Sequence, residues 1–301
     1  MDLQNRKFLI IGGAPRSGTT SLFQYLAAHP EVCESSIKET RFFLERNYPL
    51  PSVTRFDGGN LEEYGRFFAR CLRDPAKVLL EASPDYLYSR VALRIGELMP
   101  RARIVFVLRD PADRVISWYL YARHRGLLGK DVTLEAYVRM QLDNPVNEKT
   151  PLHMRAIEQG RYWTYLPAFR SVFGDRCLEV SFDRMVADTA TVVGTIAEHA
   201  GLDPEFYKGF SFQKHNASTT AALSEVHKVY LTLRRRLAFF LHPHAGIIDL
   251  LRRPNKLAKK ILGLNIPDMA EKPVLSAELR TLIQRSTRDP SLQIRTDVGD
   301  Q

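Results

Sequence analysis

The chain has 301 residues, of which 43 are Lys or Arg and 34 are Asp or Glu, so its formal net charge is +9. Charged residues make up 26% and hydrophobic residues 45% of the sequence, which excludes collagen-like, low-complexity and mainly disordered chains. The positive excess implies an anionic partner, a requirement that nucleic acid, acidic lipid, polyanionic sugar and phosphorylated cofactor all meet.

Short apolar segments alternate with amphipathic segments through the first two thirds of the chain. Buried strands are predicted at residues 8–11, 78–80, 104–108 and 177–180. Helices are predicted at residues 19–28, 61–72, 91–99, 114–123, 133–142, 162–173 and 189–200. Strands that alternate with helices predict a three-layer α/β/α fold, in which helices cover both faces of a central parallel sheet.

The pattern after residue 221 is mostly helical and basic. No linker rich in Pro, Gly or Ser divides the chain, so we predict one domain with an α/β core at 1–220, a helical extension at 221–291 and a disordered tail at 292–301. The basic residues of the extension include Arg234, Arg235, Arg236, Arg252, Arg253, Lys256, Lys259 and Lys260. Three roles remain open for this extension: it can pack on the core, border an acceptor groove or contact a membrane surface peripherally. Since no nucleic-acid reading module accompanies the charge, we expect no nucleic-acid partner.

Two features of the chain bear on its compartment. The longest apolar runs fall far short of the roughly 18 residues of a membrane span, and the first residues lack the cleavage site of a secretory signal. We therefore expect a cytoplasmic protein. The three cysteines, Cys33, Cys71 and Cys177, have neither CxxC nor zinc-ligand spacing, so buried free thiols are expected.

A glycine-containing turn joins the first predicted strand to the first predicted helix, in the segment FLIIGGAPRSGTTSLFQYL. In such a turn, loop amides and the helix N-terminus converge on a phosphate, and the hydroxyls of Thr19 and Thr20 add to them. The spacing from Gly13 to Gly18 is that of a P-loop. However, Thr19 stands where a nucleotide triphosphatase has Lys, and the cation is Arg16 within the loop. This displacement favours a ligand that has no γ-phosphate.

A second candidate anion site follows the third predicted strand. Arg109 comes directly after residues 104–108, at the edge of a parallel sheet where α/β folds bind ligands. Ser117 lies eight residues further on, about two helical turns along the chain, and can face the same anion. Two phosphate sites in one fold indicate a nucleotide with two separate phosphate groups.

These motifs resemble those of the sulfotransferases that use 3′-phosphoadenosine 5′-phosphosulfate (PAPS), over about residues 7–220. The segment APRSGTT resembles the family's 5′-phosphosulfate loop in a form found in bacterial members, with Arg16 where aryl sulfotransferases have Lys. Arg109 and Ser117 match the family's pair for the 3′-phosphate. The resemblance implies PAPS as co-substrate, adenosine 3′,5′-bisphosphate (PAP) as product and no metal. The implied nucleotide ligands are Arg16, Ser17, Gly18, Thr19, Thr20, Arg109, Ser117 and, in a basic loop, Lys214.

The segment IKETRFF resembles the corresponding segment of the heparan sulfate branch, and its ETR also matches the tyrosylprotein branch. In both branches the glutamate is the presumed general base, which implies that role for Glu39. Lys38 and Arg41 beside it favour the ionised carboxylate, although a solvated charge cluster is the alternative interpretation. Arg16 would stabilise the leaving bisphosphate electrostatically, because a guanidinium is a poor acid. Ala82 stands where several branches have Lys, which leaves one cationic role unassigned.

Together these features predict the transfer of a sulfuryl group from PAPS to a hydroxyl of a sugar, a lipid or a natural product. Acceptor identity and oligomeric state remain open. One alternative is a P-loop kinase that uses ATP and Mg²⁺, with Asp110 as metal ligand, although Thr19 in place of Lys counts against it. Another is a basic polyanion-binding protein without catalysis, which would not need Glu39.

Overall fold

The computed structural model describes residues 3–71, 78–129, 131–213 and 273–289. Its strands are β1 (Lys7–Gly13), β2 (Val32–Glu34), β3 (Val78–Ala82), β4 (Ala102–Leu108) and β5 (Cys177–Ser181). Its α-helices are α1 (Thr19–Ala27), α2 (Glu62–Arg66), α3 (Arg94–Leu98), α4 (Pro111–His124), α5 (Leu134–Asp143), α6 (Tyr162–Phe173), α7 (Phe182–Ala187), α8 (Thr189–Ala200) and α12 (Ala277–Thr287). Short 3₁₀ helices are η1 (Pro84–Tyr88), η2 (Val91–Leu93), η3 (Leu152–Met154), η4 (Glu158–Gly160), η5 (Gly174–Arg176) and η6 (Pro204–Tyr207).

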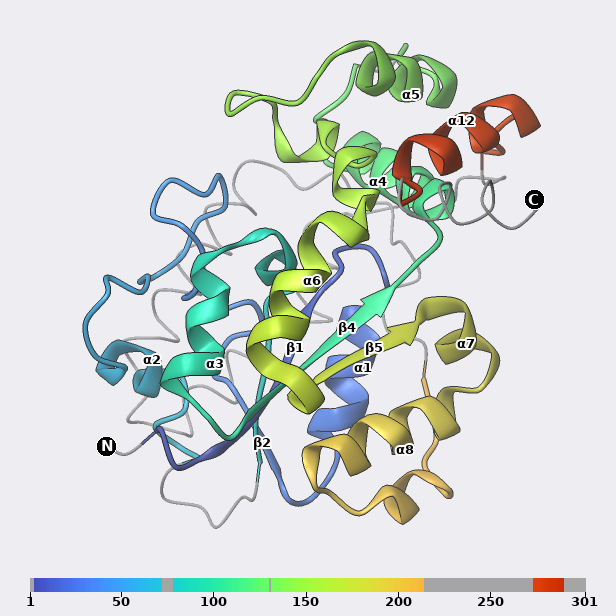
Figure 1. Ribbon diagram of the computed structural model, residues 1–301. Helices are drawn as coiled ribbons and strands as arrows, with labels where there is room; N and C mark the ends of the chain where they lie inside the picture. The colour runs from blue at the N-terminus through green and yellow to red at the C-terminus, as the bar shows by residue number, and fades with distance from the viewer. Residues whose placement is uncertain (1–2, 72–77, 130, 214–272, 290–301) are drawn as a thin grey trace, which may run out of the picture.

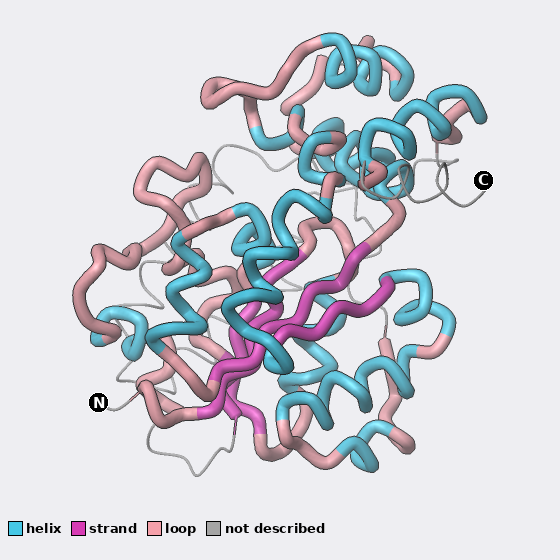
Figure 2. Tube along the Cα trace, viewed as in Figure 1, coloured by secondary structure: helices cyan, strands magenta, loops and turns pink. Residues whose placement is uncertain are grey.

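The five strands form one parallel sheet in the order β2-β3-β1-β4-β5, with helices on both faces (Figures 1 and 2). Side chains alternate along each strand, as the pleat requires. On β4, Ile104 and Phe106 pack with α3 and α6, whereas Val105 and Val107 pack with α1 and α8. This arrangement confirms the predicted α/β/α architecture, and it brings the ends of β1 and β4 to the same edge of the sheet.

A third cluster of buried apolar residues lies beyond that edge, among α4, α5 and α12. Leu279 and Ile283 of α12 are buried in it. Arg280 of the same helix pairs with Asp110 at 3.3 Å and with Asp113 at 2.7 Å, at the beginning of α4. A helix near the end of the chain therefore packs on the element that follows Arg109.

Several element predictions differ from the structure. The three-residue edge strand β2 and the short helix α7 were not predicted, because so few residues carry no clear periodicity. Only Glu62–Arg66 of the helix predicted at 61–72 is α-helical, and turns follow it. Most of the helical extension predicted at 221–291 and the tail predicted at 292–301 lie outside the described residues.

The expectation of three free thiols is wrong. Cys33 of β2 and Cys71 form a disulfide with Cα atoms 5.7 Å apart. Their sequence separation of 38 gave no spacing signal, since only the fold brings the edge strand against the segment after α2. Cys177 is free, and burial raises the pKa of its thiol to about 11. Disulfides are typical of oxidising compartments and are rare in the cytosol. The disulfide therefore counts against the cytoplasmic location, which stays a prediction.

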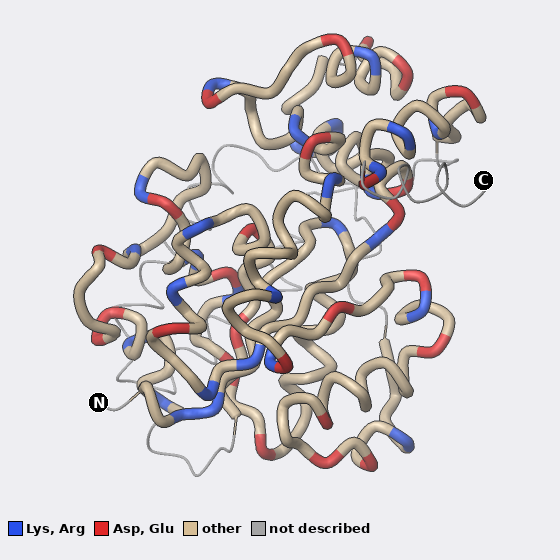
Figure 3. The backbone as a smooth tube through the Cα atoms, viewed as in Figure 1, with Lys and Arg blue, Asp and Glu red and all other residues tan. Residues whose placement is uncertain are grey.

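Two further observations concern the surface. Among the described residues, no helix is long and apolar enough to cross a membrane. Positive and negative side chains are interspersed along the described backbone (Figure 3). The net charge of this part of the chain therefore does not locate a site, and local contacts must do so.

Candidate functional site

The loop between β1 and α1 has the geometry of an anion cradle. Gly18 precedes α1 with φ at 77°, and a Cβ on it would lie 2.8 Å from the Phe182 ring. A residue with a side chain would be unfavourable here, both because φ is positive and because the Phe182 ring leaves no room for a Cβ. The Ser17 side chain is fully buried, and its Oγ has no hydrogen-bond partner among the described residues. Thr19 and Thr20 begin α1, and Gly18 before them provides no side-chain cap, so the N-terminus of this helix suits an anion.

Arg16 connects this loop to α4. Its Nε donates to Ser117 Oγ at 3.2 Å, and its guanidinium lies 4.9 Å from the centroid of the Tyr121 ring. Burial lowers the pKa of Arg16, with a smaller lowering from Arg109. No carboxylate in the described part of the chain forms an ion pair with it. A half-buried cation without an ion-pair partner among the described residues favours binding of an external anion.

Arg109 lies at the end of β4 and reaches the same loop. Its Nη1 donates to the carbonyl oxygen of Arg16 at 3.3 Å, and its guanidinium lies 4.7 Å from the Phe182 ring centroid. Its Nε is buried with no partner among the described residues, and burial lowers the pKa of the guanidinium. The structure thus brings together three residues that the sequence placed in two separate anion sites: Arg16, Arg109 and Ser117.

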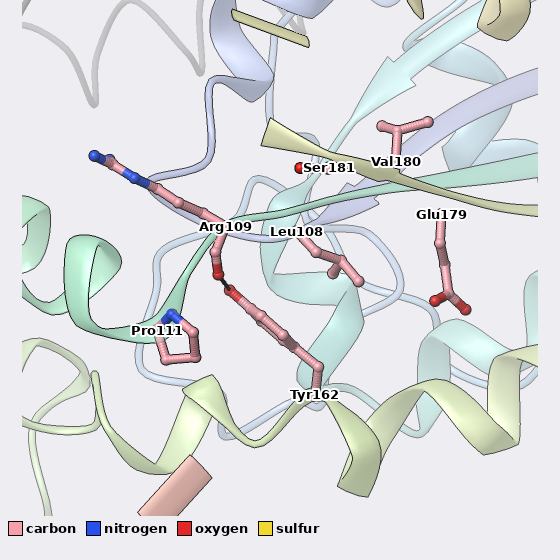
Figure 4. Close-up of a pocket in the computed structure, with 7 residues that line it drawn as sticks. All are labelled: Leu108, Arg109, Pro111, Tyr162, Glu179, Val180 and Ser181. Atoms are coloured by element: carbon pink, nitrogen blue, oxygen red, sulfur yellow. Dashed lines mark hydrogen bonds between the residues drawn. The ribbon is translucent and has the colours of Figure 1, made fainter. Parts of the chain in front are cut away.

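An open pocket of about 400 Å³ lies on the other side of the Arg109 backbone (Figure 4). Its lining is largely apolar and includes Leu108, Val180 and Tyr162, whose hydroxyl donates to the Arg109 carbonyl oxygen at 3.1 Å. The Arg109 side chain extends away from this pocket. We therefore place the anion cradle on the loop side of Arg109 and not in the pocket.

Asp110 would be the metal ligand in the kinase alternative, but its carboxylate already has hydrogen-bond and ion-pair partners within the protein. One carboxylate oxygen accepts from the Asp113 amide at 3.0 Å and pairs with Arg280, and the other accepts from Gln284 at 3.4 Å. The carboxylate therefore caps α4 and anchors α12. This geometry does not support a magnesium site at Asp110.

Glu39 lies between two cations in the segment after β2. Lys38 Nζ is 3.0 Å from one oxygen of its carboxylate, and Arg41 Nη2 is 2.5 Å from the other. The Glu39 side chain is 27% exposed, so this cluster is half-buried and not fully solvated. Its amide donates to the carbonyl oxygen of Ala82 at 2.8 Å. The buried Ala82 thus contributes only backbone here, and Lys38 and Arg41 supply the positive charge.

Two carboxylates near Glu39 were missed by sequence reasoning. Asp85 accepts a hydrogen bond from Tyr48 at 2.9 Å, and burial together with the Glu39 charge raises its pKa to about 6. Glu81 is fully buried on β3, and burial raises its pKa. Both lie in the segment around Ala82 that resembles a family motif, but the sequence assigned neither carboxylate a role, although a Glu within an otherwise apolar strand was a signal. Lys214 lies outside the described residues.

Comparison with known proteins gives concordant matches. A sequence model of the sulfotransferase domain matches residues 6–237. The chain is 27% identical over 208 residues to bifunctional heparan sulfate N-deacetylase/N-sulfotransferase 4 of Mus musculus, covering 66% of this chain and 23% of that protein. It is 30% identical over 210 residues to bifunctional heparan sulfate N-deacetylase/N-sulfotransferase 2 of Homo sapiens, covering 66% and 22%. The chain thus spans less than a quarter of the length of these relatives.

Among solved structures, a sulfotransferase from Alicyclobacillus acidocaldarius superposes with a TM-score of 0.55 at 21% identity. The superposition covers 78% of this chain and 92% of that one. At this identity the likeness concerns the fold, and it agrees with the parallel sheet and its helical layers.

Proposed function

Because the chain belongs to the sulfotransferase family, we propose that it transfers a sulfuryl group from PAPS to a hydroxyl of an acceptor. The observation that carries this proposal is the convergence of Arg16, Ser117 and Arg109. The first two are joined at 3.2 Å, and Arg109 contacts the Arg16 backbone at 3.3 Å. Two anion sites this close suit a nucleotide with a phosphate at each end of its ribose.

The residues present fit PAPS. The buried hydroxyl of Ser17 and the buried Nε of Arg109 lack partners among the described residues, so an incoming phosphate would satisfy both. Ser17, Gly18, Thr19 and Thr20 would hold the 5′ end with backbone amides and hydroxyls. Arg109 and Ser117 would hold the 3′-phosphate, and Lys214 stays a further proposed ligand. Bound PAPS would supply the sulfuryl group, whose transfer leaves PAP.

The proposed chemistry divides between two side chains. Glu39 removes the proton of the acceptor hydroxyl, and its flanking cations keep the carboxylate ionised for that task. Arg16 stabilises the negative charge that develops on the departing bisphosphate. Since a guanidinium stays protonated, this contribution is electrostatic and involves no proton transfer. The proposed reaction calls for no metal.

For the acceptor we propose a carbohydrate first, because the similar vertebrate proteins carry heparan sulfate in their names. A hydroxyl of a lipid or natural product is the second class. The kinase alternative is not supported, since the family match and the occupied Asp110 both oppose it. Peripheral membrane contact through the basic extension concerns residues outside the described part.

Thermal unfolding with PAP, compared with ATP plus Mg²⁺, tests the nucleotide assignment. A ligand that binds only the folded state raises the melting temperature as its concentration exceeds the dissociation constant. We expect PAP to raise the melting temperature by several degrees and ATP with Mg²⁺ to have a much smaller effect. Stabilisation by ATP with Mg²⁺ alone would contradict the proposal.

A turnover assay that needs no identified acceptor complements this binding test. With [³⁵S]PAPS and water as the sulfuryl acceptor, formation of inorganic sulfate reports on the base and on Arg16. O-desulfated heparan sulfate, which offers hydroxyls and keeps its amino groups substituted, serves as the first carbohydrate probe in the same assay. Incorporation of ³⁵S into the polysaccharide would support a carbohydrate acceptor, and sulfate release without incorporation would favour the second class.

A further inference from the structure

Glu81 is a buried carboxylate whose partners are four hydroxyl groups. It is fully buried on β3, and no Lys or Arg of the described residues forms an ion pair with it. Its Oε1 accepts from Thr40 at 2.5 Å, from Ser83 at 2.7 Å and from Tyr86 at 2.9 Å. Its Oε2 accepts from Tyr64 at 2.6 Å. A buried acceptor with this many donors is fully satisfied, so it fixes the position of every group that donates to it.

Two of these donors lead directly to the segment that carries the proposed base. Thr40 is the residue after Glu39, and its Oγ1 also accepts from the Phe42 amide at 3.3 Å. Ser83 Oγ accepts from the Arg41 amide at 3.0 Å while it donates to Glu81. Glu81 therefore holds the backbone at Thr40 and, through Ser83, at Arg41, directly after Glu39.

The backbone of this segment needs such support. Glu39 has φ at 64° and Arg41 has φ at 57°, so two residues with side chains occupy the left-handed region on either side of Thr40. This region is unfavourable for residues other than glycine, and such backbone persists only where the surroundings determine it. Here the hydrogen bonds from Thr40 and Ser83 to Glu81 hold the backbone in this conformation.

The remaining two donors anchor Glu81 to the core. Tyr64 of α2 packs against Phe42 and Phe43, with ring centroids 5.2 and 5.1 Å away. Tyr86 of η1 accepts from the Phe43 amide at 3.2 Å. Thr40, Glu81 and Ser83 are each at most 1% exposed, so none of them can touch a substrate.

We propose that Glu81 is a positioning residue for Glu39, acting through Thr40 and Ser83 to set the backbone that presents the Glu39 carboxylate between Lys38 and Arg41. This inference rests on the proposed function, in which Glu39 is the base. On this proposal, Glu81 affects the rate of sulfuryl transfer and does not affect nucleotide binding. Burial raises the pKa of Glu81, which agrees with a site that is closed to solvent.

A matched pair of variants tests the proposal. Thr40→Val and Tyr64→Phe each delete one hydroxyl donor to Glu81 and keep the shape of the side chain, but only Thr40 lies on the Glu39 segment. We expect Thr40→Val to lower kcat for sulfate release from [³⁵S]PAPS at least tenfold, while the PAP dissociation constant changes less than twofold. We expect Tyr64→Phe to keep kcat within twofold, and Thr40→Ser, which restores the hydroxyl, to recover activity.

Amide hydrogen exchange provides a readout that does not depend on activity. Thr40→Val should speed exchange at the Arg41 and Phe42 amides, and Tyr64→Phe should not. Equal loss of kcat in Thr40→Val and Tyr64→Phe, or unchanged exchange at those two amides in Thr40→Val, would overturn the positioning role. Full activity of Glu39→Gln would instead remove the proposed base itself, so the two failures are distinguishable.

Discussion

The charged residues of the candidate site form two groups that differ in whether they have ion-pair partners within the protein. On the proposed nucleotide side, neither Arg16 nor Arg109 forms an ion pair with a carboxylate of the described residues. Arg16 donates to Ser117, Arg109 donates to the Arg16 carbonyl oxygen, and each guanidinium lies near an aromatic ring. On the acceptor side, the Glu39 carboxylate is paired with Lys38 and Arg41. The first group therefore suits an external anion, whereas in the second the carboxylate already has its cationic partners and its position depends on the backbone.

This contrast predicts that substitutions will separate into two groups. Changes on the nucleotide side should weaken PAP binding, because they remove interactions with the bound anion. Changes on the acceptor side should lower turnover and leave PAP affinity nearly unchanged. The predictions that follow test this separation, from the largest expected effect to the smallest.

Glu39→Gln should produce the largest change. The amide keeps the size of the side chain but cannot accept the acceptor proton, so turnover should fall at least about 100-fold, as is typical of a lost general base. The measurement is the rate of [³⁵S]sulfate release or transfer at saturating PAPS. Turnover within a few-fold of wild type would show that another group removes the proton.

Cys33→Ser, or reduction of the disulfide, should lower stability by about 2–4 kcal/mol, because the bond closes a loop of 38 residues. Urea unfolding measures the change, and Cys177→Ser is the matched control because Cys177 is free. Since Cys33 belongs to β2, which leads into the Glu39 segment, we expect turnover to fall more than PAP affinity. A larger loss of PAP affinity than of turnover would show that the disulfide supports the nucleotide side instead.

Arg109→Ala should weaken PAP binding about 10- to 100-fold. Hydrogen bonds to charged groups contribute about 1.5–3 kcal/mol, and each 1.4 kcal/mol corresponds to a factor of ten in affinity. Titration calorimetry measures the dissociation constant, and Arg170→Ala is a matched control, since the Arg170 guanidinium pairs with Glu179 away from the cradle. An unchanged constant in Arg109→Ala would remove this residue from the 3′-phosphate site.

Asp85→Asn should change how stability depends on pH. The pKa of Asp85 is raised from 3.8 to about 6, so the folded protein binds this proton more tightly than the unfolded chain. Wild-type stability should therefore fall as pH rises from 4 to 6, and the variant should lack that part of the decline. We expect a difference of about 1–2 kcal/mol, because part of the raised pKa of Asp85 comes from the nearby Glu39 charge and not from burial alone. Parallel stability curves from urea unfolding would contradict this effect.

The part of this site that depends on consecutive residues could be predicted from the sequence. The segment from Ala14 to Gly18 forms a loop because Gly18 and the helix that follows it are local features, and Arg109 and Ser117 are placed by one strand and one helix. For the same reason four of the five strands and the parallel sheet were predicted correctly.

The part that depends on distant contacts could not be predicted. Glu81 meets Thr40 and Tyr64 only after β3 is inserted into the sheet, 41 and 17 residues away along the chain. The Cys33–Cys71 pairing and the contact of Arg280 with Asp110 depend on tertiary packing in the same way. Hydrophobic periodicity carries no information about such partners.

The PAP dissociation constant of Glu39→Gln, measured beside that of Arg109→Ala in the same buffer, tests the division of the site most directly. If recognition and turnover reside in separate halves, Glu39→Gln binds PAP within twofold of wild type while Arg109→Ala binds at least tenfold more weakly. Equal losses of PAP affinity in the two variants would contradict the account.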